Sequence, residues 1–167
     1  MEDTRLQQLW DQQQIRDLMM NFGYALDVKN YDLYRSCYMS EFEVEFSSLT
    51  DSEPAPPVST TAEKWSTFAE AVLEGVELHH LYGSHMISEL TEGTAVGKLY
   101  FTARHRKSSD RNDAYYTEHG YYDLGYSKHN ENWLISFIKL NIQWTTGNLS
   151  VLTLSPRAQS MAGEIFG

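Results

Sequence analysis

Cysteine is nearly absent from this chain of 167 residues, because Cys37 is its only one. No disulfide can therefore form within the chain. We expect Cys37 on a short helix between Tyr34 and Tyr38, a setting that favours a packed, inert thiol over a nucleophile. A chain of this kind fits a reducing compartment, and we expect the protein to be cytoplasmic.

Long apolar runs and basic clusters are also missing. No run approaches the roughly 20 apolar residues that span a bilayer, and residues 1–8 are polar and acidic, so we expect no membrane or targeting segment. Lys and Arg number 13 against 23 Asp and Glu, which gives a formal net charge of −10, and the longest basic cluster is residues 104–107. Nucleic acid and anionic membranes are therefore poor candidate partners.

What the chain does contain is enough apolar side chain for a core. It is 41% hydrophobic and 13% aromatic, which at this length predicts one domain over residues 1–167. Apolar residues at steps of three and four predict a long helix over residues 5–27, buried along one stripe. The residues of this stripe are Leu6, Leu9, Trp10, Ile15, Leu18, Met19, Phe22 and Leu26.

The rest of the chain changes from helical to extended patterns. A short helix over residues 31–38 precedes a strand over residues 42–46, whose phenylalanines face inward. The proline-rich residues 51–59 predict a surface loop, and a capping box at residues 60–63 begins a third helix to about residue 74. Four extended segments in hairpin order follow, at residues 78–90, 95–106, 114–127 and 132–145, and residues 155–166 can form a last helix.

Three helices followed by an antiparallel meander predict a two-layer α+β fold. A strongly curved sheet would wrap the first helix and leave a cone-shaped, apolar pocket between them. We expect Trp133 and Trp144 in the core.

Two histidines and one carboxylate are the candidates for chemistry in this pocket. His80 and His105 each lie on an apolar-faced strand, and Asp27 closes the first helix. The unperturbed imidazole pKa of roughly 6.5 suits proton transfer near neutral pH. His105 alternates in phase with Phe101 and Ala103, so it shares their apolar face, where burial favours its neutral form.

Several runs carry a resemblance to a known family. Residues 26–32 (LDVKNYD), 79–83 (HHLYG), 97–106 and 138–144 (IKLNIQW), together with Trp133, resemble the scytalone dehydratases of the NTF2-like, or SnoaL-like, superfamily. The likeness runs from about residue 9 to the end of the chain. It implies a cone-shaped α+β barrel, His80 and His105 as the two catalytic histidines, and Asp27 as the carboxylate that orients the second.

The chain departs from that family at the groups that polarise the substrate carbonyl. Leu26 and Phe46 stand where the family has tyrosines, and the family's substrate-contacting serine and asparagine fall near Gly120 and Tyr122. Loss of these hydroxyls suggests a less polar substrate than a multiply hydroxylated naphthalenone.

The resemblance implies elimination of water from a polyketide-derived β-hydroxy ketone, without cofactor or metal. We assign His80 as the base and His105, held by Asp27, as the partner acid. Tyr24 or Tyr122 could stabilise the enolate oxygen in place of the missing phenols. The residues that we expect to contact substrate are Tyr24, Leu26, Phe46, Phe101 and Tyr122.

Other interpretations stay open. The same enolisation would serve an isomerase or cyclase acting on a polyketide or meroterpenoid, and the fold also serves as a non-catalytic binding module. A metal triad is disfavoured because the three residues come from separate elements. The resemblance also implies a dimer or trimer formed through the outer face of the sheet, and a C-terminal segment, residues 155–166, that covers the pocket mouth.

Overall fold

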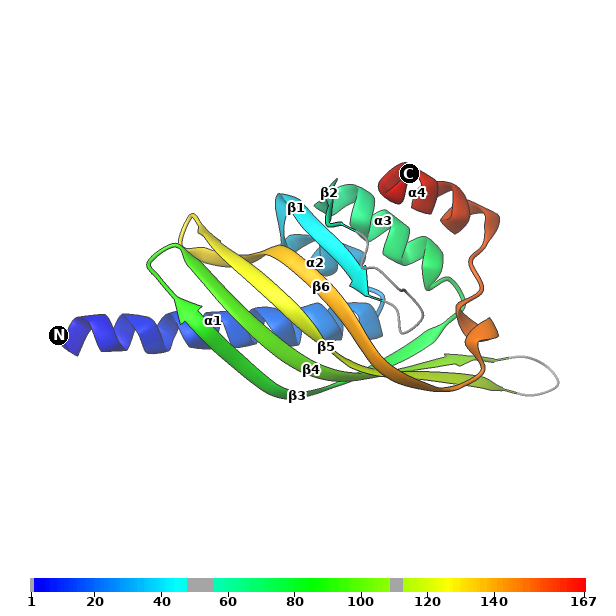
Figure 1. Ribbon diagram of the computed structural model, residues 1–167, viewed down its shortest axis with the longest axis horizontal. Helices are drawn as coiled ribbons and strands as arrows, with labels where there is room; N and C mark the ends of the chain where they lie inside the picture. Colours follow the sequence, from blue (N-terminus) through cyan, green and yellow to red (C-terminus); the bar gives the residue numbers. More distant parts are fainter. Residues whose placement is uncertain (1, 48–55, 109–112) are drawn as a thin grey trace.

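The computed structural model describes residues 2–47, 56–108 and 113–167, and it builds four α-helices and one curved sheet from them (Figure 1). The predicted loop at residues 51–59 therefore lies partly outside the described residues. In chain order the elements are α1 (Glu2–Asp27), α2 (Tyr31–Ser36), β1 (Tyr38–Ser47), β2 (Val58–Thr61), α3 (Ala62–Val72), β3 (Glu77–Leu90), β4 (Thr94–Lys107), β5 (Ala114–His129), β6 (Asn132–Gly147), the 3-10 turn η1 (Leu149–Leu152) and α4 (Pro156–Phe166).

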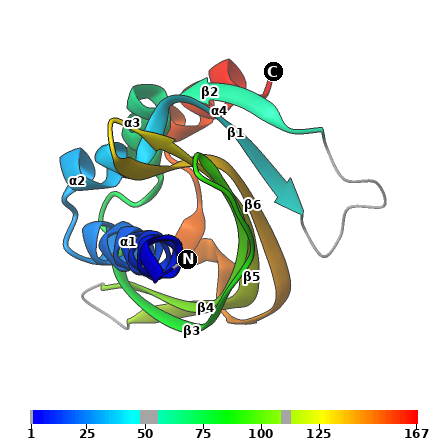
Figure 2. The same ribbon diagram turned by 90° about the vertical axis from the view of Figure 1, so that its left-hand side faces the viewer.

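The six strands form one mixed sheet in the order β2-β1-β6-β5-β4-β3. Strands β3 to β6 are the predicted antiparallel meander, whereas β1 pairs with β6 in parallel. Figure 2 shows the sheet curving around α1, with α3 and α4 above it. This arrangement confirms the predicted α+β cone. The sheet is not a closed barrel, however, because the described strands β2 and β3 are its two edges.

The helix stripe and the strand alternation decide which side chains fill the core. Ile15, Met19, Phe22 and Ala25 of α1 are buried, as their spacing predicts. The first turns of α1 behave differently, because they extend past the edge of the sheet (Figure 1). Leu6, Leu9 and Trp10 are accordingly about 60% exposed, and the prediction that the buried stripe begins at Leu6 is wrong.

One tryptophan of β6 is in the core and the other is not. Trp133 is buried, and its indole N–H donates to Asp11 at 2.9 Å, while Lys128 pairs with the same carboxylate at 3.0 Å. Trp144 is 52% exposed and stacks on His119 on the outer face of the sheet. The prediction of a core position for Trp144 is therefore wrong, because the register shift in β6 between Ile142 and Trp144 turns this side chain to the outer face.

The sequence analysis did not predict strand β2. β2 begins at Val58, directly after the prolines, and pairs antiparallel with β1. Four residues are too few to show a reliable alternation, so the proline-rich stretch masks this edge strand.

Candidate functional site

The end of α1 positions Asp27. The helix closes through Lys29, which adopts a left-handed φ of 60°, and Asn30 donates its backbone N–H to the Ala25 carbonyl at 2.8 Å. Asp27 thus lies in the last helical turn, where the helix dipole disfavours a carboxylate. Strong partners outside the helix are needed to hold it there.

His80 on β3 supplies those partners. Its Nδ1 lies 2.6 Å from Asp27 Oδ1, and its backbone N–H donates to the same carboxylate at 3.0 and 3.2 Å. Burial raises the pKa of Asp27, but the His80 side-chain and backbone hydrogen bonds outweigh it and leave that pKa below its usual value. Because an ionised carboxylate only accepts, Nδ1 of His80 carries the proton and Nε2 is left as the basic nitrogen.

This geometry corrects the expected partner of Asp27. The sequence analysis has Asp27 orient His105, but the carboxylate binds His80 instead. The reason is that α1 packs against the edge strand β3, so its last turn reaches β3 before β4. His105 Nδ1 lies 3.3 Å from the Tyr116 carbonyl oxygen, which can only accept, so Nδ1 again carries the proton.

His105 is a neutral imidazole at pH 7. It is 5% exposed, and burial lowers its pKa to about 4, with a further reduction from His80 and an opposing hydrogen bond to the Tyr116 backbone. Its Nε2 can accept a proton but has none to give. This environment does not favour His105 as the acid, and its role stays a prediction.

A carboxylic acid that the sequence analysis missed lies on the same face. Strand pairing aligns His80, Ala103, Glu118 and Thr145 in one row across β3, β4, β5 and β6. His105 belongs to the adjacent row. His80 and Glu118 thus lie on either side of Ala103. Apart from glycine, alanine is the smallest residue that this position could have.

Burial raises the pKa of Glu118 to about 7, against an opposing hydrogen bond from the Tyr116 hydroxyl. Glu118 is therefore protonated in a large fraction of molecules near neutral pH. The signal for it was present in the sequence, since Glu118 alternates in phase with the buried Tyr116, Tyr122 and Leu124. A carboxyl in an inward row is a candidate for function.

The five residues expected to contact substrate do not lie together in the structure. Leu26, Phe101 and Tyr122 are in the core, with Phe101 stacked on Tyr122 at 4.5 Å between ring centroids. Phe46 instead joins an aromatic cluster with Trp65 of α3 and Phe166 of α4.

Tyr24 is 60% exposed, so its phenol faces solvent and not the interior where the predicted substrate contact would lie. Tyr24 is three residues before Asp27, but the stripe that faces the sheet in this part of α1 contains Phe22, Ala25 and Leu26. The angle around the helix between positions 24 and 27 is large enough that Tyr24 faces solvent while Asp27 faces β3.

The space beside His80 is filled by Tyr82. Its ring lies 6.0 Å from the His80 ring, and a Cβ added at Gly23 of α1 would come within 2.7 Å of its hydroxyl oxygen. Gly23 therefore lets the helix and Tyr82 approach closely. The Tyr82 hydroxyl has no hydrogen-bond partner among the described residues, which makes it a donor available to a ligand.

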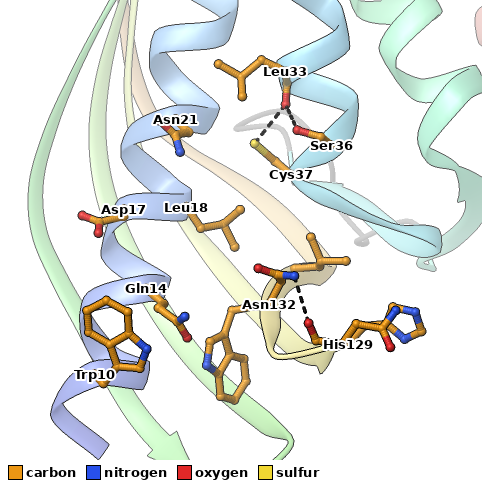
Figure 3. A pocket seen from close by; sticks show the side chains of 13 residues that line it. Trp10, Gln14, Asp17, Leu18, Asn21, Leu33, Ser36, Cys37, His129 and Asn132 are labelled. Atoms are coloured by element: carbon orange, nitrogen blue, oxygen red, sulfur yellow. Dashed lines mark hydrogen bonds between the residues drawn. The ribbon is translucent and has the colours of Figure 1, made fainter. Parts of the chain in front are cut away.

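The described surface hollows lie elsewhere. Five hollows of about 230–560 Å³ are lined by none of Asp27, His80, His105 and Glu118. Figure 3 shows one of about 520 Å³ between α1, α2 and the β5–β6 turn, bordered by Trp10. The cone-shaped pocket expected at Asp27, His80 and His105 is not among these five. Of the site residues, Asp27 has a side chain that is 20% exposed, and Glu118 is partly buried.

Two further features bear on the class of site. Within the described residues, no group of three or more His, Cys, Asp and Glu is arranged to hold a metal ion. No described helix has a stretch that is both long and apolar enough to cross a bilayer.

A family model for the SnoaL-like domain matches residues 7–139, and the chain belongs to this family. The NTF2-like character expected from the sequence is thereby confirmed. No curated protein matches the chain in sequence.

Solved structures of the same fold include enzymes and proteins of other descriptions. The protein Kfla4162 from Kribbella flavida is 20% identical, with a TM-score of 0.74 over 85% of this chain and 96% of that one. A candidate scytalone dehydratase from Novosphingobium aromaticivorans is also 20% identical, with a TM-score of 0.71 over 89% and 92% of the two chains. A type 2 hexachlorocyclohexane dehydrochlorinase, LinA, is 14% identical, with a TM-score of 0.70 over 91% and 98%.

Proposed function

We propose that the protein is a cofactor-independent lyase that eliminates water from a small, largely apolar β-hydroxy ketone of the polyketide type. The observation that carries this proposal is the Asp27–His80 pair, with 2.6 Å between Oδ1 and Nδ1. It leaves His80 with a defined tautomer and an oriented ring. An imidazole so held is the arrangement that proton abstraction beside a carbonyl requires.

The chemistry of the relatives agrees with an elimination. Two solved structures of this fold are described as a candidate scytalone dehydratase and a dehydrochlorinase, and both names denote removal of a proton and a leaving group from adjacent carbons. In this chain, Nε2 of His80 would take the proton from the carbon beside the carbonyl. The ionised Asp27 would stabilise the imidazolium that results.

The test uses β-hydroxy-tetralone, a bicyclic aryl ketone that becomes naphthol on loss of water. Naphthol formation is followed by absorbance, and a mass decrease of one water separates a lyase from an isomerase or cyclase. His80→Asn keeps a donor for Asp27 but has no basic nitrogen, so we expect turnover to fall by roughly 10²- to 10⁴-fold. Asp27→Asn should also lower kcat.

The matched control is His79→Asn, on the neighbouring residue. His79 lies 4.0 Å from Asp27 with its side chain 66% exposed, so this variant should keep wild-type activity. Wild-type protein that forms no naphthol would reject the proposed reaction. A fully active His80→Asn variant would show that the Asp27–His80 pair does not abstract the proton.

A further inference from the structure

We propose that Glu118 is the acid that protonates the departing hydroxyl group. This inference rests on the proposed elimination and assigns its second half-reaction, for which the sequence analysis had named His105. It also specifies the substrate class, because a hydroxyl leaves only with a proton, whereas a weakly basic leaving group departs without one.

Geometry places Glu118 across from the base. His80 and Glu118 stand on the same face in one row of the sheet, separated only by Ala103 on β4. Two strand spacings of about 4.8 Å set their backbones roughly 10 Å apart. Both residues lie on the face of the sheet that curves around α1 (Figure 2).

Among the titratable groups on this face of the sheet, Glu118 is the one best suited to donate a proton. On this face the titratable neighbours are Tyr116 and Tyr122 of β5, His105 of β4, and His80 and Tyr82 of β3, with Asp27 and Lys29 at the end of α1. His105 has committed its only N–H to the Tyr116 carbonyl. Burial keeps the three phenols protonated, with pKa values raised too far for efficient donation.

The proposed reaction is balanced without a co-reactant. His80 Nε2 takes the α-proton, and the C–H electron pair becomes the new carbon–carbon double bond by way of the enolate. The C–O bond breaks with its electron pair going to oxygen, and that oxygen takes the Glu118 proton and departs as water. One proton then returns from His80 to Glu118 through solvent, which reaches the partly exposed Glu118.

Two leaving groups on one skeleton test this assignment. β-Hydroxy-tetralone needs the acid, whereas β-acetoxy-tetralone releases acetate without protonation, and both give the same naphthol. For Glu118→Gln we expect roughly 10²-fold slower turnover of the hydroxy compound and acetoxy turnover within a few-fold of wild type. In the wild type, turnover of the hydroxy compound should also decline above pH 7, as Glu118 loses its proton. Turnover of the acetoxy compound should show no such decline.

The control is Asp123→Asn, which removes a carboxylate from the opposite face of the same strand, where it pairs with Lys98 at 2.9 Å. It should alter neither rate, and circular dichroism checks the fold of both variants. Equal losses of both rates in Glu118→Gln, or no loss of either, would overturn the role of Glu118. Wild-type protein that eliminates only acetate would overturn it too, while a wild type inactive on both compounds would reject the proposed function itself.

Discussion

Replacing His105 should change how the stability of the protein depends on pH. The folded protein holds this imidazole at a pKa of about 4, against an ordinary value of 6.5. The unfolded chain therefore binds a proton more readily than the folded one between these two values. The contribution of neutral His105 to stability is complete above pH 6.5 and is lost as the pH falls toward 4.

The size of the effect follows from the shift. One pKa unit corresponds to about 1.4 kcal/mol, so the full contribution is roughly 3 kcal/mol, of which about 2 kcal/mol is lost between pH 8 and pH 5. His105→Asn is the suitable change, because its amide can still donate to the Tyr116 carbonyl while it does not titrate. His85 has a pKa lowered in the same way, and Glu118 has one raised with the opposite effect on stability, but both are present in either protein and cancel.

Denaturant titrations of the wild type and His105→Asn at pH 8 and pH 5 provide the assay. The stability difference between the two proteins should move by about 2 kcal/mol in favour of the variant on acidification. His129→Asn, at the exposed end of β5, is the control and should show no such movement. A difference that stays constant with pH would refute the view that His105 is buried as a neutral ring.

Three further changes test the packing that holds the site. Asp11→Ala removes the acceptor of the Trp133 indole N–H, and the free energy of unfolding should fall by about 3 kcal/mol in denaturant titrations; a change below 1 kcal/mol would contradict this. Gly120→Ala would set a Cβ 2.1 Å from the Asn141 carbonyl oxygen, so it should cost at least about 2 kcal/mol by the same measurement. Gly163→Ala on α4, where an added Cβ meets nothing within 4 Å, should instead raise the melting temperature by stabilising the helix by about 0.5–1 kcal/mol.

Much of the fold follows from periodicity that is local in the sequence. The three- and four-residue spacing of Ile15, Met19 and Phe22 specifies the buried face of α1, and alternation specifies the inward rows of β4 and β5. These patterns also place His105 on the inner face. They fail at the start of α1, because an apolar pattern does not show how far the covering element extends, and at Trp144, because it does not show the register shift that turns this side chain outward.

The pairing within the site was beyond the reach of such patterns. Whether Asp27 meets His80 or His105 depends on which strand lies under the last turn of α1, and the register between β3 and β4 then separates the two rings. Glu118 is an intermediate case. Its phase along β5 is evident in the sequence, but its place beside Ala103 comes from strand pairing.

The sequence by itself determined the α+β class, the inward faces and the residue types available for proton transfer, because each depends on side chains within a few positions of one another. Only the tertiary structure decided that Asp27 binds His80, that burial lowers the pKa of His105, and that Glu118, whose pKa burial raises, shares a row of the sheet with His80. Those three outcomes depend on burial and on contacts between residues that are far apart in the chain.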